Sequence, residues 1–196
     1  MERNLETRRK ILETARGLFG EQGVRKTTLD DIARRMQRTK SFVYHYFRGK
    51  DDLFAALIEV EGDAYARQLR EAIDGEKGAK KRLHTYMLAR FRIINDLGGY
   101  YRAMRERYFE QYAFIENARV KYDRFETETM IGILTQGTRD GEFRSLDAEA
   151  VAHAILIAMK GFEIEWATTD RRGFEGKLDD LLGVLFEGIV KRKGRA

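Results

Sequence analysis

A chain of 196 residues that is 43% hydrophobic and 35% charged can bury a substantial core, which excludes a wholly disordered protein. The absence of Cys excludes disulfides and Cys-based zinc sites, and the absence of Pro leaves few hard breaks in helical segments. No apolar run approaches the roughly 18 residues that span a bilayer, and charged residues follow Met1. We therefore expect an all-α, cytoplasmic protein.

The net charge of +5 is unevenly distributed along the chain. Residues 1–50 contain 13 Lys and Arg against 6 Asp and Glu, a net charge of +7, whereas the other 146 residues contain 24 and 26, a net charge of −2. A basic excess confined to one segment indicates a surface for a polyanion such as DNA. A chance surplus of surface Arg would produce the same count.

The N-terminal segment predicts two helices. Apolar residues recur at helical spacing over 5–19. A second, shorter helix is expected over about 28–36, with Thr28 before it and with Asp30 and Asp31 in its opening turn, where negative charge suits the helix dipole. The apolar stripe of the first helix consists of Leu5, Ile11, Leu12, Ala15, Leu18 and Phe19.

The segment TKSFVYHYF predicts a third helix from Thr39, a plausible N-cap, through Phe47. Residues three and four apart share a helix face, so this helix has one polar and one apolar side. Two short helices joined by a tight turn and preceded by a longer one match the helix-turn-helix unit that binds DNA. The outward side holds Lys40, Ser41, Tyr44, His45 and Arg48, while Val43 and Phe47 are expected to pack against Phe19, Leu29 and Ile32.

The rest of the chain also predicts helices. They are expected at 51–73, 80–97, 147–168 and 174–191, with one or two more between 100 and 137. The last two are too apolar for one core to cover, which indicates a homodimer in which both helices pair with their copies in a four-helix bundle. The alternative is a monomer in which both are central helices.

The run TTLDDIARRMQRTKSFVYHYFRGKDDLF, together with the preceding RRKILETARGLFGEQGVRKTT, resembles the helix-turn-helix of the tetracycline-repressor (TetR) family over residues 8–54. Beyond residue 60 only the chain length and the helical pattern match. The resemblance implies an all-helical homodimer of about nine helices per subunit, a ligand-responsive regulator and most often a repressor. A helix-turn-helix DNA-binding domain over 1–50 would precede a ligand-binding and dimerisation domain over 51–196.

The resemblance also implies roles for particular residues. Thr28 and Lys50 match positions that hold DNA phosphates. The chain departs from the family at the turn, where Gln37 and Arg38 replace a small and an aliphatic residue, so the turn could be looser or Arg38 could add a phosphate contact. Phe42 replaces a small residue and could touch a thymine methyl or pack sideways. The predicted DNA-binding set is Thr27, Thr28, Arg38, Thr39, Phe42 and Lys50, with Lys40, Ser41, Tyr44 and His45 facing the groove.

The stretch YYRAMRERYFEQYAFI is the densest aromatic candidate for a ligand pocket. Its rings and Met share one helix face, and such walls suit an elongated or planar apolar ligand, for example a fatty acid, an acyl-CoA or an aromatic compound. Such a stripe is equally typical of an ordinary core. The predicted ligand-binding set is Met87, Phe91, Ile94, Tyr101, Met104, Tyr108, Tyr112, Met130, Phe162 and Trp166.

The sign of the ligand's charge stays open. Glu163 or Glu165 could face a cation, whereas Arg92, Arg102 and Arg105 could hold an acidic head group. Our hypothesis is that the ligand tilts the long helix after the DNA-binding segment and so changes the spacing of the two recognition helices.

Two other classes of protein compete with a ligand-responsive regulator. An enzyme is disfavoured because HExxH, GxSxG, P-loop and GxGxxG spacings are absent, and His45, His84 and His153 lie on three different predicted helices. No catalytic residue, metal site or cofactor is predicted. A constitutive DNA-binding protein would share the first 50 residues but have little use for a ring-lined cavity. The expected partners are a double-stranded DNA operator, a small-molecule effector and a second copy of the chain, with no membrane.

Overall fold

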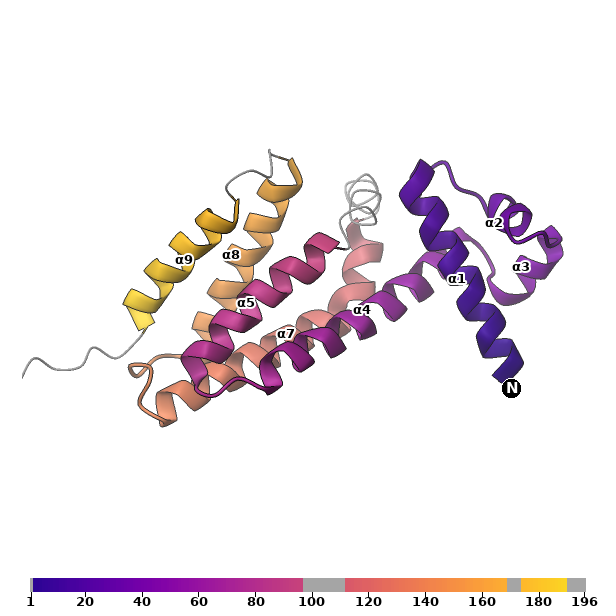
Figure 1. The fold of residues 1–196 in the computed structure, drawn as a ribbon. Coiled ribbons are helices and arrows are strands. Elements are labelled where there is room, and N and C mark those ends of the chain that lie inside the picture. The colour runs from indigo at the N-terminus through magenta and orange to yellow at the C-terminus, as the bar shows by residue number, and fades with distance from the viewer. Residues whose placement is uncertain (1, 97–111, 169–173, 190–196) are drawn as a thin grey trace, which may run out of the picture. The chain divides into compact units, whose positions relative to one another are not determined.

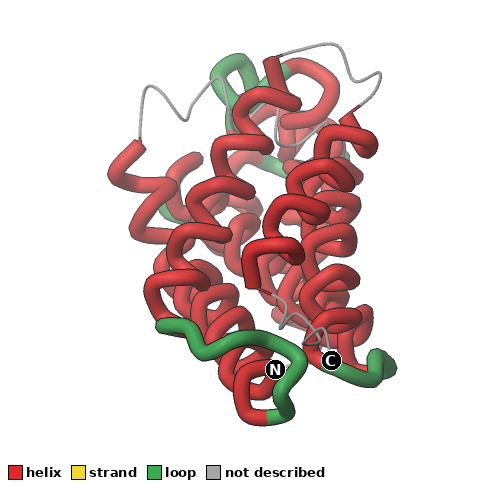
Figure 2. The backbone as a smooth tube through the Cα atoms, turned by 90° about the vertical axis from the view of Figure 1, so that its left-hand side faces the viewer, coloured by secondary structure: helices red, strands yellow, loops and turns green. Residues whose placement is uncertain are grey.

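The computed structural model describes residues 2–96, 112–168 and 174–189. Figure 2 shows that the regular structure in these ranges is helical, without strands, which confirms the all-α fold class. In chain order (Figure 1) the helices are α1 (Glu2–Gln22), α2 (Leu29–Arg35), α3 (Lys40–Tyr46), α4 (Lys50–Asp74), α5 (Ala79–Asp96), α7 (Tyr112–Arg139), α8 (Ala148–Thr168) and α9 (Phe174–Ile189). Within the described ranges, no helix has the length and apolar character to cross a membrane.

The helix boundaries agree closely with the predicted ones, and the differences have local causes. α3 ends at Tyr46 because Phe47 takes an extended backbone, with φ −137° and ψ 125°. α1 begins at Glu2, before the predicted start at residue 5. The expected apolar stripe of α1 is wrong at its first member, since Leu5 is 65% exposed and the buried stripe begins at Ile11.

Contacts between Cα atoms divide the chain into two compact units. The first unit comprises the residues up to Tyr65 with the described residues between 94 and 120, and the second comprises 66–93 with the described residues from 121 onward. α4 contributes to both units. The first unit therefore extends past the boundary expected at residue 50, and the division into domains stays a prediction.

The first unit has a single apolar core that joins α1, α2, α3 and the start of α4. Val43 and Phe47 are buried in it together with Phe19, Leu29 and Ile32, as the sequence pattern predicted. Phe19 also meets Phe54 of α4 edge to face, with ring centroids 5.8 Å apart. The inward side of α3 is therefore packed into this core, and this packing sets the orientation of α3 relative to α1 and α2.

Two residues of the segment between α7 and α8 bind the ends of other helices in the second unit. The carboxylate of Glu142 accepts hydrogen bonds from the backbone N–H groups of Ala79 (2.8 Å) and Lys80 (3.1 Å), at the N-terminus of α5. The Arg144 guanidinium donates to the carbonyl of Gly188 (2.6 Å), at the C-terminus of α9. These charges complement the helix dipoles and satisfy backbone groups that a helix end leaves unpaired.

Candidate nucleic-acid interface

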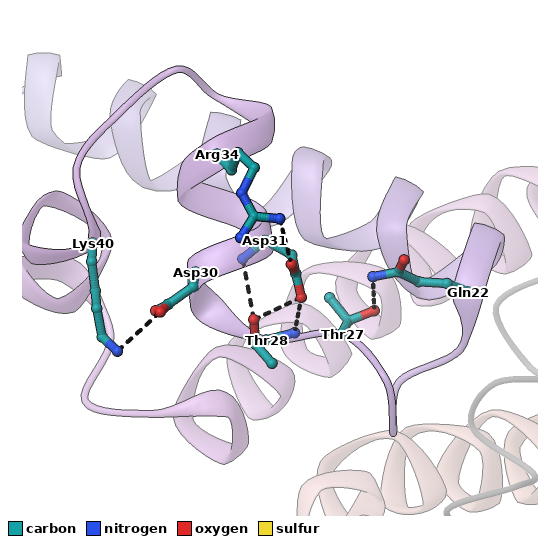
Figure 3. Close-up of polar contacts among 7 residues, drawn as sticks. All are labelled: Gln22, Thr27, Thr28, Asp30, Asp31, Arg34 and Lys40. Atoms are coloured by element: carbon teal, nitrogen blue, oxygen red, sulfur yellow. Dashed lines mark hydrogen bonds and ion pairs between the residues drawn. The ribbon is translucent and has the colours of Figure 1, made fainter.

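The N-terminus of α2 is closed by a capping box between Thr28 and Asp31. The Thr28 hydroxyl accepts a hydrogen bond from the Asp31 N–H (3.2 Å), and the Asp31 carboxylate accepts from the Thr28 N–H (2.9 Å), as Figure 3 shows. The Thr28 hydroxyl also donates to the Asp31 carboxylate (2.7 Å), and this bond, together with the one from the Thr28 N–H and a smaller contribution from the Arg34 guanidinium, holds the pKa of the Asp31 carboxyl below its usual value. The start of α2 is therefore fixed by local side chains.

The turn between α2 and α3 is closed by hydrogen bonds, and the sequence had left open whether it would be looser. Gln37 has a φ of 54°, in the left-handed region. Its N–H donates to the carbonyl of Arg34 (3.0 Å), and the N–H of Arg38 donates to the carbonyl of Ala33 (2.9 Å). This is the hydrogen-bond pattern of a Schellman motif, in which Gly or Asn usually supplies the left-handed residue. The sequence conceals the motif because Gln occupies that position.

The outward side of α3 is exposed, as the sequence pattern predicted. Tyr44 has 44% of its surface exposed, whereas Val43 on the opposite side has none. Thr39 precedes the helix, but its hydroxyl lies 3.1 Å from the Ser41 hydroxyl and makes no capping bond to the backbone. The side chains of Lys40, Ser41 and His45 are exposed with Tyr44, and Arg48, which lies beyond the end of α3, is exposed as well.

Lys40 connects α3 to α2 through an ion pair. Its ammonium lies 3.0 Å from the Asp30 carboxylate (Figure 3) and 5.5 Å from the centre of the Tyr44 ring. The hydrogen bond to Asp30 and the negative charge of that carboxylate raise the pKa of Lys40. Both partners of the pair are largely exposed, so solvent screens the attraction and the ammonium can exchange Asp30 for another anion.

Phe42 packs sideways along α3 rather than projecting from it. Its ring is half-buried and lies 5.5 Å from the Tyr46 ring, and the Arg38 guanidinium lies 5.4 Å from the Phe42 ring centre. Tyr46 is also in edge contact with His45, with centroids 5.2 Å apart. The Phe42 ring therefore packs beside Tyr46 and Arg38, and its contact with a thymine methyl stays a prediction.

Lys50 and Thr27 are tied to the loop between α1 and α2. The Lys50 ammonium donates to the carbonyls of Val24 (2.9 Å), Arg25 (3.0 Å) and Thr27 (3.0 Å). The Thr27 hydroxyl donates to the Gly23 carbonyl (2.8 Å), and the side chain of Thr27 has no exposed surface. We therefore leave Thr27 out of the proposed DNA contacts.

The predicted ligand-binding residues are only partly within the described chain. Met87, Phe91 and Met130 are buried in the second unit and Phe162 is half-buried there, while Ile94 is buried in the first unit. The remaining candidates, Tyr101, Met104 and Tyr108 and the side chains of Tyr112 and Trp166, lie outside what the structure describes.

Sequence reasoning missed a polar group in the interior of the second unit. Arg90 and Glu126 form a buried ion pair, with Nε to Oε1 at 2.8 Å and Nη2 to Oε2 at 3.3 Å. Tyr86, one turn before Arg90 on α5, is fully buried. Burial and the Glu126 charge raise the pKa of the Tyr86 phenol. The signal in the sequence is the spacing of Arg82, Tyr86 and Arg90 at every fourth residue, which places three polar side chains on one side of a largely apolar helix.

The comparisons with known proteins agree with this geometry. Residues 11–57 match the model of a family described as bacterial regulatory proteins, tetR family. The chain is similar to the transcriptional regulator HbdR of Aromatoleum sp. (strain CIB), at 24% identity over 97% of this chain and 83% of that protein. It is also similar to the transcriptional repressor KstR2 of Mycobacterium tuberculosis (strain CDC 1551 / Oshkosh), at 29% identity over 74% and 73% of the two chains.

A solved structure supports the fold independently. A transcriptional regulator from Saccharomonospora viridis, in complex with choline, superposes with a TM-score of 0.79 and covers 95% of this chain and 99% of that one. At 22% identity this likeness shows the fold alone.

Proposed function

Since the chain belongs to the tetR family of bacterial regulatory proteins and is a transcriptional regulator, we propose that it is a ligand-responsive repressor that binds a palindromic operator through the exposed side of α3. The observation that carries this proposal is the two-sided packing of α3. Val43 and Phe47 are buried in the core, while Lys40, Tyr44 and His45 are exposed on the opposite side.

The chemistry of the exposed side suits double-stranded DNA. Lys40 can donate to guanine or phosphate, the Ser41 hydroxyl to a base edge, and the Tyr44 hydroxyl to phosphate. In this proposal Lys40 exchanges its contact with the Asp30 carboxylate for a contact with DNA. Lys50 reaches a phosphate only if it gives up one of its hydrogen bonds to the three backbone carbonyls. The charged contacts supply most of the affinity, so binding should weaken as salt rises.

The exposed surfaces of α8 and α9 support a homodimer. Ile157 on α8 is 56% exposed and Val184 on α9 is 72% exposed, although both are large apolar residues. Small residues that allow close helix approach are exposed on the same helices, namely Ala150, Ala154 and Gly161 on α8 and Gly183 and Gly188 on α9. We propose that these helices pair with their copies in a four-helix bundle.

The proposed response to an effector acts through α4, because this helix contributes residues to both compact units. An effector that favours one tilt of α4 changes the spacing of the two recognition helices in the dimer. Half-sites on B-DNA require a spacing of about one helical turn or a multiple of it, so operator affinity falls. Operator affinity that stays unchanged at a saturating effector concentration would rule this mechanism out.

The test of DNA binding is an electrophoretic mobility shift on the DNA upstream of the protein's own gene. Replacing Tyr44 with Ala should weaken binding by more than about 1 kcal/mol, because a direct contact is lost, while the dimer stays intact. Leu5→Ala is the matched control, since Leu5 is exposed on α1 outside the proposed surface. Equal affinity of Tyr44→Ala and the unmodified protein would show that the reading surface is misassigned.

A further inference from the structure

One face of α5 carries a polar row in an otherwise apolar interior. Arg82, Tyr86 and Arg90 are spaced every four residues, which places them on the same side of the helix. The ends of the row contact α7. The Arg82 Nη1 donates to the Gln136 side-chain oxygen (2.7 Å), and the Nε and Nη2 atoms of Arg90 donate to the Glu126 carboxylate. The two pairs run in opposite chain directions, so α5 and α7 are antiparallel here and Tyr86 lies between the two polar contacts.

Two donors in this row have no hydrogen-bond partner among the described residues. They are the Tyr86 hydroxyl and the Arg82 Nε, and both atoms are buried. The whole Tyr86 side chain has 0% of its surface exposed. Native proteins rarely leave such groups unsatisfied, because a buried donor without an acceptor has lost its hydrogen bonds to water. Two in neighbouring turns of one helix indicate a place where an acceptor binds.

The chemistry of the row selects the kind of acceptor. The Arg82 Nε can only donate, and burial together with the Glu126 charge raises the pKa of the Tyr86 phenol, so its proton stays available for donation. Arg90 and Glu126 compensate each other's charge, whereas the contact of Arg82 with Gln136 is to a neutral amide. The five residues therefore carry one more positive than negative charge, which favours a single anionic group.

The surroundings of the row select the rest of the bound molecule. Buried apolar side chains flank Tyr86 along α5 and line the facing part of α7, and none is more than 1% exposed. A molecule that reaches the two donors must therefore place apolar surface against these side chains. The flanking residues are Leu83 and Met87 on α5 and Met130, Ile133 and Leu134 on α7.

We propose that Arg82 and Tyr86 bind the carboxylate of a monoanionic effector whose remaining surface is apolar, with one carboxylate oxygen on each donor. This inference rests on the proposed function, because it takes the bound molecule to be the effector, and it gives that effector a charge. Arg92, the sequence-based candidate on the same helix for an acidic head group, is exposed and does not belong to this row.

The experiment compares three probes of the same size and shape with the full-length protein at pH 7. They are 4-phenylbutanoate, 5-phenylpentan-2-one and (4-methylpentyl)benzene, and binding is measured by titration calorimetry. The carboxylate should bind about tenfold more tightly than the ketone, which has one acceptor oxygen and no charge, and the hydrocarbon should bind most weakly. Equal affinities of the three probes, or no detectable binding of the carboxylate, would overturn the proposal.

Two variants and one control assign the effect to the row. Tyr86→Phe and Arg82→Lys should each lower the affinity for 4-phenylbutanoate about tenfold, because each removes one donor and Arg82→Lys keeps the charge. Arg92→Gln, an exposed substitution on the same helix, should leave the affinity unchanged. If Arg92→Gln weakens binding as much as the two variants do, the anion binds by general surface charge and the proposal fails.

The stability of Tyr86→Phe without any probe gives an independent readout. If the hydroxyl has no internal partner, its removal should leave the thermal midpoint unchanged or raise it. A lower midpoint would show that the hydroxyl is satisfied by a resident water or a protein group, and this outcome overturns the proposal.

Operator binding separates this inference from the proposed function. Tyr86→Phe and Arg82→Lys should bind the upstream DNA as tightly as the unmodified protein when no probe is present. If the unmodified protein fails to bind DNA but shows the expected order of probes, the regulator proposal fails and the carboxylate site stands. If it binds DNA but shows no preference among the probes, only the carboxylate site fails.

Discussion

The ion pair between α2 and α3 and the ion pair between α5 and α7 lie in opposite environments. The side chains of Lys40 and Asp30 are 62% and 43% exposed, whereas those of Arg90 and Glu126 are 1% and 4% exposed. Water screens an exposed pair and competes for both partners, so such a pair stabilises little and its charges remain available to a ligand. A buried pair has already lost its water, so each charge depends on the other. The ion pair on the proposed DNA surface is therefore exchangeable, whereas the buried pair between α5 and α7 is fixed.

The largest expected effect comes from breaking the buried pair. Glu126→Gln should lower the free energy of unfolding by about 3–5 kcal/mol, because the buried Arg90 guanidinium would lose the negative charge that it contacts at 2.8 Å. Urea unfolding followed by circular dichroism, at one fixed protein concentration, measures this loss.

Two further variants make this test specific. The matched change in an exposed pair, Glu21→Gln opposite Arg35, should leave the unfolding midpoint nearly unchanged. The double variant Arg90→Met/Glu126→Leu should recover much of the lost stability, since a well-packed apolar pair avoids the cost of burying charge. If Glu126→Gln and Glu21→Gln shift the midpoint equally, the contrast between the two regions is wrong.

A second prediction concerns the tight packing of the second unit. A Cβ at Gly137 would overlap the ring of Phe143 and would lie 2.8 Å from the Cβ of Ala79. Gly137→Ala should therefore destabilise the protein by roughly 1–3 kcal/mol, measured by thermal unfolding. Gly132→Ala is the matched control on the same helix, where nothing lies within 4 Å, and it should stabilise by about 0.5–1 kcal/mol. Equal shifts in the same direction for both variants would contradict this account.

The third prediction tests the capping box of α2. Thr28→Ala should lower stability by about 1 kcal/mol, because the N–H of Asp31 loses its acceptor. Thr28→Ser keeps the hydroxyl and should be close to the unmodified protein in chemical unfolding. A loss of the same size in Thr28→Ser would mean that the methyl group, rather than the cap, is responsible.

A fourth prediction follows from the lowered pKa of Asp31. A carboxyl whose pKa is lower in the folded state stabilises the protein above its unfolded pKa, near about 4, and loses this contribution as the pH falls through the folded value. The stability difference between the unmodified protein and Asp31→Asn should therefore be full at pH 6 and should shrink below about pH 4. Unfolding midpoints measured across this range test it, and a difference that grows on acidification would contradict it.

The smallest expected effect is in the turn before α3. Gln37 holds a φ of 54°, which costs a residue with a side chain more than it costs Gly. Gln37→Gly should therefore stabilise the protein by about 0.5–1 kcal/mol in thermal unfolding, and Gln37→Val should destabilise it. A stabilising effect of Val would show that the turn relaxes to another conformation.

Much of the fold could be predicted because helix periodicity is a local property. The capping residue of α2 and the two sides of α3 follow from residues within one or two turns of each other. Contacts between distant residues do not follow from local spacing. Thr27, predicted as a DNA contact, is buried under the loop, and the Lys50 ammonium donates to carbonyls 23 to 26 residues earlier in the chain, so its contact with a DNA phosphate stays a prediction.

The sequence by itself determined that the chain is helical, that α3 presents a basic and hydroxyl-bearing side, and which family it resembles. These properties depend on the spacing and the type of neighbouring residues. Only the tertiary structure decided that Arg90 meets Glu126, 36 residues away, and that Tyr86 and Arg82 keep buried donors beside them. The reason is physical: periodicity tells which side of a helix is apolar, but the partner of a buried charge depends on how two helices are aligned.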